Sequence, residues 1–129
     1  MASLLLPVIY LAFISLGLPD ALLGAAALGD IGQHFPDTDE QYRGISSLKL
    51  LARVCGMLHD AGYTIGNADV TILLQRPKVA PYIGRIRETL AQVMDIDVSR
   101  LNVKATTEEG LGFTGSGEGA AVHAVVLLE

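Results

Sequence analysis

The sequence predicts an α/β (α+β) domain, in which helices pack against a sheet. Segments with apolar residues at helical spacing alternate along the chain with short β-branched or alternating segments, which is the pattern of such a domain. The length of 129 residues suits one domain with a moderate core, and 50% of the residues are hydrophobic. This composition excludes a disordered chain. The formal net charge of −5 argues against a nucleic-acid partner, which needs an excess of Lys and Arg.

The N-terminal segment differs from the rest of the chain. Residues 1–19 contain no charged residue, and the first 30 residues contain Asp20 and Asp30 as their only charges. We therefore divide the chain into an apolar N-terminal segment, residues 1–19, and a domain over residues 20–129. The segment approaches the ~20 apolar residues that span a membrane, and residues 1–25 weakly resemble the start of a major facilitator transporter. A buried helix of the domain and a membrane contact through residues 1–19 both fit this composition.

The first half of the domain is predicted to be helical with one loop. Asp20–Leu28 is rich in Ala and Leu, which favours a helix. Gly29–Thr38 is rich in turn residues and predicts a loop. A second helix begins at Ser46 or Ser47 and ends before Gly62, a typical residue after a helix C-terminus. Its apolar stripe comprises Leu48, Leu51, Val54, Cys55 and Leu58.

The second half of the domain alternates strands with a helix. Ala68–Gln75 is β-branched and predicts a strand. Pro81 suits the first turn of the next helix. Leu101–Thr106 alternates as a half-buried strand does, and Ala120–Leu128 predicts a final apolar strand. The apolar face of the helix comprises Ile83, Ile86, Leu90, Val93 and Met94, and the inward positions of the half-buried strand are Leu101, Val103 and Ala105.

Three carboxylates gather in the predicted loop. Asp30, Asp37 and Asp39 lie close together in the sequence, beside Gly32 and Pro36. Such carboxylates can accept hydrogen bonds from sugar hydroxyls, hold a hard cation or transfer a proton. Helix capping and turn formation are the alternative roles, and the residues alone leave both open.

Two other segments have side chains suited to a nucleotide. Gln75–Lys78 leaves a strand and enters a proline-bounded turn, where backbone groups can bind a nucleobase edge and Lys78 a phosphate. Lys104–Glu109 and the glycine-rich Phe113–Gly119 offer a lysine, hydroxyls and carboxylates for phosphate oxygens and Mg²⁺. The alternatives are an ordinary strand-to-helix connection and a polar loop between strands.

Five strings in the domain resemble the 2-C-methyl-D-erythritol 2,4-cyclodiphosphate synthase family in order and spacing. They are DALLGAAALGDIG (20–32), HFPDTD (34–39), GYTIGNADVTILLQRPK (62–78), LNVKATTEEGLGFTGSGEG (101–119) and AVHAVVLLE (121–129). The resemblance implies a mixed sheet packed by helices and a cytoplasmic homotrimer with sites between subunits. It also implies a lyase of non-mevalonate isoprenoid biosynthesis. The substrate would be a CDP-linked methylerythritol 2-phosphate, whose 2-phosphate attacks the diphosphate and releases CMP.

The resemblance implies roles for individual residues as well. Asp30, Ile31 and Gly32 match the segment that holds the ribose, and Phe35, Pro36, Asp37, Thr38 and Asp39 match the loop around the methylerythritol phosphate. Leu74, Gln75, Arg76, Pro77, Lys78, Val79 and Ala80 match the segment that reads cytosine. Thr106, Thr107, Glu108, Glu109, Phe113 and Ser116 match substrate-contacting positions. Among these, Thr107 holds the catalytic position that stabilises the transition state, and Glu109 matches the ligand of a Mg or Mn ion between the nucleotide phosphates.

The sequence departs from the family in its metal ligands. The family's N-terminal strand hairpin carries an Asp-x-His pair, and a later His completes a site for a zinc-type ion, Zn or Mn. Here no His precedes His34 and no Asp-x-His occurs, so the sequence predicts that this hairpin and this site are missing. Two functions stay open: the family's cyclisation, or a catalytically dead, truncated or fused remnant that at most binds cytidine nucleotide.

Overall fold

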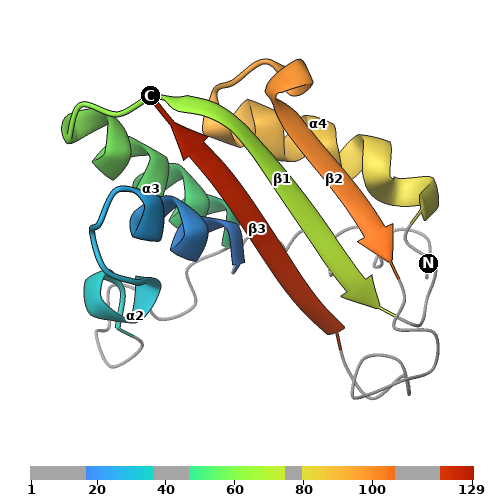
Figure 1. Ribbon diagram of the computed structural model, residues 1–129, viewed down its shortest axis with the longest axis horizontal. Coiled ribbons are helices and arrows are strands. Elements are labelled where there is room, and N and C mark those ends of the chain that lie inside the picture. Colours follow the sequence, from blue (N-terminus) through green and yellow to red (C-terminus); the bar gives the residue numbers. More distant parts are fainter. Residues whose placement is uncertain (1–16, 37–46, 75–79, 107–119) are drawn as a thin grey trace.

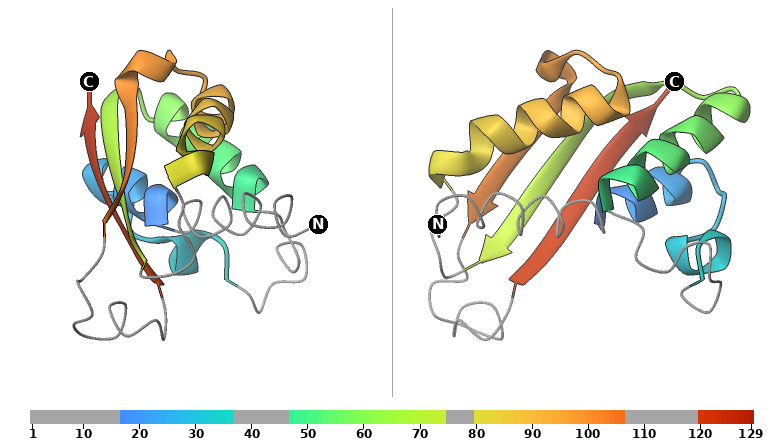
Figure 2. Two further views of the ribbon diagram at one scale, coloured as in Figure 1. Left: turned by 90° about the vertical axis from the view of Figure 1, so that its right-hand side faces the viewer. Right: turned by 180° about the vertical axis from the view of Figure 1, so that it is seen from behind.

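The computed structural model describes residues 17–36, 47–74, 80–106 and 120–129. A three-stranded sheet forms one layer, and helices α3 and α4 cover one of its faces (Figure 1; Figure 2, left). In chain order the elements are α2 (Ile31–His34), α3 (Ser47–Asp60), β1 (Ile65–Leu74), the 3₁₀ turn η2 (Ala80–Tyr82), α4 (Ile83–Met94), the 3₁₀ turn η3 (Val98–Arg100), β2 (Leu101–Thr106) and β3 (Ala120–Leu128). The prediction of an α+β domain with a mixed sheet packed by helices is confirmed.

The central strand is β1, and the sheet order is β2-β1-β3. β1 runs parallel to β2, with Ala68 opposite Leu101, and antiparallel to β3. The parallel pair is joined through α4, as parallel strands require a crossover. The C-terminus is tied to the start of β1, because the backbone groups of Thr64 and Glu129 exchange hydrogen bonds of 2.9 and 2.8 Å.

The core lies between the sheet and its helices. Val70 and Ile72 of β1 are almost fully buried there, beside Leu101 and Val103 of β2. The predicted helix stripes supply the opposite wall, with Leu51, Val54 and Leu58 from α3 and Ile86, Leu90 and Met94 from α4. The prediction from helical spacing is therefore confirmed, because the apolar stripes of α3 and α4 both face the apolar side of the sheet.

Helices α3 and α4 both end in a tight turn with a left-handed residue. Gly62 follows α3 at φ +91°, and the Tyr63 amide donates to the Leu58 carbonyl at 2.9 Å. Asp95 follows α4 at φ +56°, and the Ile96 amide donates to the Ala91 carbonyl at 3.1 Å. These bonds satisfy carbonyls that a helix end otherwise leaves open. The predicted stop at Gly62 is confirmed.

Residues 17–25 form a further helix that packs beside β3. Leu18, Leu22 and Leu23 are fully buried in the core. Gly17 approaches β3 so closely that a Cβ there would lie 3.1 Å from the Val122 Cγ1 atom. The helix runs through the predicted boundary at residue 20, but residues 1–16 lie outside the described residues and the division of the chain stays a prediction. Among the helices that the structure describes, none is long and apolar enough to cross a membrane.

Details of several elements differ from the sequence-based expectation. The helix expected over Asp20–Leu28 covers residues 17–25 instead, so Leu28 lies beyond its end. Within the predicted loop Gly29–Thr38, residues Ile31–His34 form a short helix, because Asp30 caps it. Strand β1 begins at Ile65, earlier than expected, because Ile65 pairs with Leu128 across a register shift. Ala105 was expected to face inward but is exposed, so the buried face of β2 is limited to its first half.

The substitution Leu22→Ala should destabilise the protein by about 2 to 5 kcal/mol, because it leaves a cavity in the core. Urea unfolding of the purified protein measures the change. The control is Gly24→Ala in the same helix, where an added Cβ meets no atom within 4 Å and helix propensity favours Ala by up to about 1 kcal/mol. A loss of no more than about 0.5 kcal/mol for Leu22→Ala would show that this helix is not docked.

Candidate functional site

The strand ends next to the predicted nucleotide-binding segments lie at one edge of the sheet. Leu73 of β1 is opposite Thr106 of β2, and Leu74 is opposite Ala120 of β3. The ends of β1 and β2 and the start of β3 therefore lie side by side (Figure 1). Ligands of sheets with parallel strands bind beyond the carboxyl ends of those strands. The structure thus brings together the strand ends from which the predicted cytosine and phosphate segments depart.

Part of the predicted site lies within the described residues at this edge. Thr106 ends β2 with an exposed side chain, and Ala80 begins η2, directly before α4. The predicted residues that lie outside the described residues are Asp37, Thr38, Asp39, Gln75, Arg76, Pro77, Lys78, Val79, Thr107, Glu108, Glu109, Phe113 and Ser116. Their roles stay predictions.

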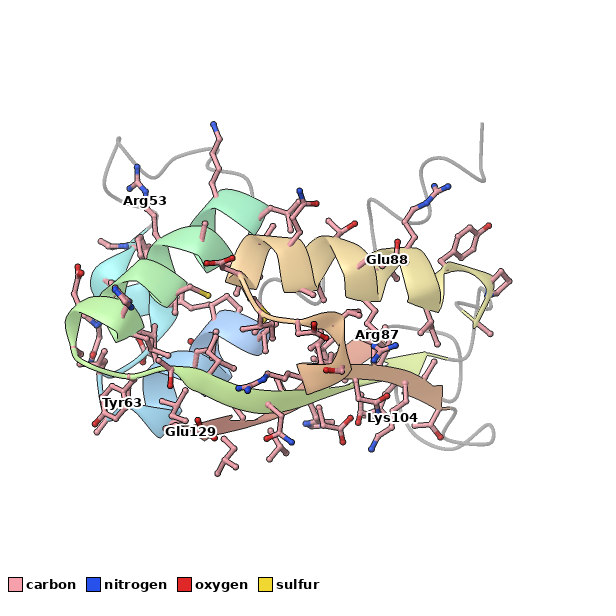
Figure 3. All side chains as sticks on the ribbon, turned by 90° about the horizontal axis from the view of Figure 1, so that it is seen from above. Arg53, Tyr63, Arg87, Glu88, Lys104 and Glu129 are labelled. Atoms are coloured by element: carbon pink, nitrogen blue, oxygen red, sulfur yellow. The ribbon has the colours of Figure 1, made fainter. Side chains whose placement is uncertain are left out.

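A polar cluster precedes Thr106 on the outer face of the sheet. The Lys104 Nζ atom donates to the Asp69 Oδ2 atom at 2.7 Å, and the Asn102 Nδ2 atom donates to Asp69 Oδ1 at 3.1 Å. The hydrogen bond from Lys104, followed by that from Asn102, lowers the pKa of Asp69 below its usual value. Lys104, labelled in Figure 3, is thus held by a carboxylate on the neighbouring strand. The sequence singled out Lys104 but missed Asp69 and Asn102, although strand alternation places all three on one face.

The second predicted region, Asp30 to Pro36, surrounds α2. The Asp30 Oδ1 atom accepts a hydrogen bond from the backbone N–H of Gln33 at 2.9 Å, so Asp30 caps α2. Asp20 supports the same turn, because its Oδ1 atom accepts from the Ile31 amide at 2.8 Å. Capping was one of the two roles that the sequence left open for this carboxylate. Capping uses the Oδ1 atom of Asp30, so the Oδ2 atom can accept a hydrogen bond from another group.

The two predicted regions lie apart within one chain. Figure 1 and the right panel of Figure 2 show α2 on the opposite side of the molecule from the ends of β1 and β2. The structure therefore does not bring Asp30, Ile31, Gly32, Phe35 and Pro36 to the edge that carries Leu74 and Thr106. Within one chain, the two predicted regions are therefore separate.

The described residues do not form a metal centre. Across residues 17–36, 47–74, 80–106 and 120–129, no group of three or more His, Cys, Asp or Glu side chains could hold an ion. The three histidines lie on separate elements: His34 on α2, His59 on α3 and His123 on β3. The described residues therefore do not fit the zinc-type site of the family that the sequence resembles.

The chain is similar to known proteins over most of its length. The model of the YgbB family matches residues 14–129. A relative from Trichlorobacter lovleyi, named 2-C-methyl-D-erythritol 2,4-cyclodiphosphate synthase, is 61% identical over 109 residues, which are 84% of this chain and 69% of that protein. The bifunctional IspDF from Campylobacter jejuni superposes with a TM-score of 0.85 and 40% identity, over 90% of this chain and 31% of that one. A 2C-methyl-D-erythritol-2,4-cyclodiphosphate synthase in its CDP-bound form gives a TM-score of 0.82 and 34% identity, over 89% and 74% of the two chains.

The substitution Asp69→Asn should destabilise the protein slightly at pH 7, by less than about 1 kcal/mol, because the Asp69–Lys104 pair is exposed. The folded-state pKa of Asp69 lies below 3.8, so the stabilisation is complete above that value and is lost as the pH falls through the lowered pKa. Urea unfolding at several pH values should therefore show wild type and variant converging as the pH falls below about 4.

In a Lys104→Met background, the same substitution should give a smaller pH-dependent difference, because Asn102 alone then lowers the pKa of Asp69. An identical pH dependence in both backgrounds would contradict the role of Lys104.

Proposed function

The chain belongs to the YgbB family of 2-C-methyl-D-erythritol 2,4-cyclodiphosphate synthases, and from this membership we propose its reaction. It converts a CDP-linked methylerythritol 2-phosphate into the cyclic diphosphate and releases CMP, as a phosphorus–oxygen lyase of isoprenoid precursor synthesis. The meeting of Leu74, Thr106 and Ala120 at one sheet edge carries the proposal, because the predicted cytosine and phosphate segments depart from there. The CDP-bound relative supports the same nucleotide for this chain.

The proposed chemistry is phosphoryl transfer. An oxygen of the 2-phosphate forms a bond to the diphosphate phosphorus that is bonded to the methylerythritol. The bond from that phosphorus to the bridging oxygen breaks, and this oxygen leaves with CMP. Such a reaction depends on positioning and on neutralising phosphate charge. The backbone of residues 74–80 would hold the cytosine, and the hydroxyls of Thr106 and Thr107 would donate to phosphate oxygens. A Mg or Mn ion at Glu109 would neutralise charge between the nucleotide phosphates.

The predicted half-sites support a homotrimer, in which one subunit provides the nucleotide edge and its neighbour provides the loop around Asp30. The outer sheet face supports the same assembly. Among the described residues no helix covers that face, and on it Val125 is 73% exposed and Leu127 61% exposed. Neighbouring exposed apolar residues on a sheet mark a surface for association. From the membership of the family we propose that this trimer is cytoplasmic.

The first test is CMP release by the purified protein from the CDP-linked substrate with Mg²⁺ and Zn²⁺. Thr106→Val should lower kcat at least about tenfold, because it removes one donor to the phosphates. The matched control is Thr89→Val on α4, whose hydroxyl donates to the Arg85 carbonyl at 2.9 Å within its own helix, and it should keep wild-type turnover. Saturable CDP binding without CMP above background would establish the alternative, a catalytically dead remnant.

The shared site is tested by mixing two variants. Asp30→Ser keeps a capping oxygen for α2 but shortens its reach, and Thr106→Val removes the phosphate donor from the other half-site. Each variant alone should have low activity. Unfolding and refolding them together in equal amounts should restore about a quarter of the wild-type sites, because those sites combine two intact halves. Activity that stays at the level of the separate variants would show that each chain completes its own site.

A further inference from the structure

A pocket of about 640 Å³ lies at the edge of the fold opposite to the predicted nucleotide residues. It is lined by the last turns of α3 and α4, the start of β1 and the connection from α4 to β2. The volume is in the range of small-molecule sites. The parallel strands begin here and end at Leu74 and Thr106, so the length of the sheet separates this pocket from those residues.

The inner wall of the pocket is apolar. Leu58 of α3, Ile65 of β1 and Met94 of α4 line it, and each is more than nine-tenths buried. Gly56 of α3 also lines the pocket, and a Cβ built there meets no atom within 4 Å. The helix surface at Gly56 therefore leaves open the space that a side chain would occupy.

The rim of the pocket is negative. Helices α3 and α4 both end at the pocket, and a helix C-terminus carries a partial negative charge. Asp95 and Asp97 add two carboxylates from the turn after α4. Asp97 accepts a hydrogen bond from the Ser99 amide at 2.9 Å, which lowers its pKa and keeps it ionised.

Two side chains of basic residues also line the pocket. The Arg100 guanidinium contacts the Gly66 carbonyl at 3.5 Å, which directs it toward the start of β1. His59 lies in the last turn of α3. The carboxylates of Asp95 and Asp97 and the C-terminal ends of α3 and α4 outnumber the one guanidinium, that of Arg100. This balance of charge favours a positively charged ligand group.

We propose that this pocket binds a small amphipathic organic cation, whose apolar body lies against Leu58, Ile65 and Met94 and whose ammonium group faces Asp95 and Asp97. The apolar wall excludes a bare metal ion as the matching ligand, and the negative rim disfavours an organic anion. The site is independent of the proposed cyclisation, because it shares no residue with it.

The probe is phenethylamine, titrated into the full chain and followed by amide shifts in ¹H–¹⁵N NMR spectra. We expect saturable shifts around Gly56 and Asp95 with a dissociation constant of about 1 mM, because a ligand this small makes few contacts. Phenylacetate has a similar body and the opposite charge, and it should bind at least about fivefold more weakly. Equal affinities, or no saturation by phenethylamine, would overturn the proposal.

Two variants test the place and the charge. Gly56→Phe should fill the pocket and abolish the shifts, whereas the matched control Gly84→Phe should leave them unchanged, since Gly84 also has open space around its Cβ but does not line the pocket. Asp95→Asn with Asp97→Asn should weaken phenethylamine binding about fivefold. Asn tolerates the left-handed position 95 and can still cap Ser99. Unchanged binding in Gly56→Phe, or in the double variant, would refute the site.

Discussion

The pairing of β1 with two strands from distant parts of the sequence is the constraint on which the rest of the structure depends. Val70 and Ile72 bury its inner face, and both of its edges carry a hydrogen-bonded neighbour. Because β2 is parallel and β3 antiparallel, the end of β1 lies between the end of β2 and the start of β3. One register therefore places three strand ends together, each next to a segment that is predicted to bind the substrate, although more than 40 residues separate the first from the last.

The same sheet accounts for the proposed division of the site between two chains. Its inner face is used by the core, so additional groups can reach the nucleotide edge from the outer side or from a neighbour. The outer face carries the ion-paired cluster of Asp69, Asn102 and Lys104 on two strands, and the exposed Val125 and Leu127 on the third. A second copy that covered this face would bury the apolar part and would meet fixed charges beside it. Apolar burial would then supply affinity, and the charges would set the orientation.

Much of this fold follows from local patterns. The spacing of Leu51, Val54 and Leu58 predicts α3 and its buried face, and Gly62 predicts its end. The sequence could not show that Asp69 faces Lys104, because a contact between strands depends on register, which the chain specifies through tertiary packing. The early start of β1 at Ile65 was missed for the same reason, since its partner Leu128 lies at the far end of the chain.

The sequence predicted the chemistry of the candidate site but not its arrangement in space. Residue types around Asp30 and Thr106 pointed to sugar and phosphate binding, but nothing in their order along the chain shows that they lie on opposite sides of the molecule. The pocket at Gly56 had no signal in the sequence at all. It arises where two helix ends and two strand starts meet, and none of these four elements marks it alone.

The direction of α4 links the two ends of the sheet. A helix that joins parallel strands runs back along them, so α4 begins near the end of β1 and ends before the start of β2. Its positive N-terminus therefore lies on the side of the strand ends, where phosphates are proposed to bind, and its negative C-terminus lies at the pocket. The crossover that the parallel pair requires thus gives the domain opposite electrostatic preferences at its two edges. The dipole of α4 would thus favour an anionic nucleotide at the ends of the parallel strands and an organic cation in the pocket at their start.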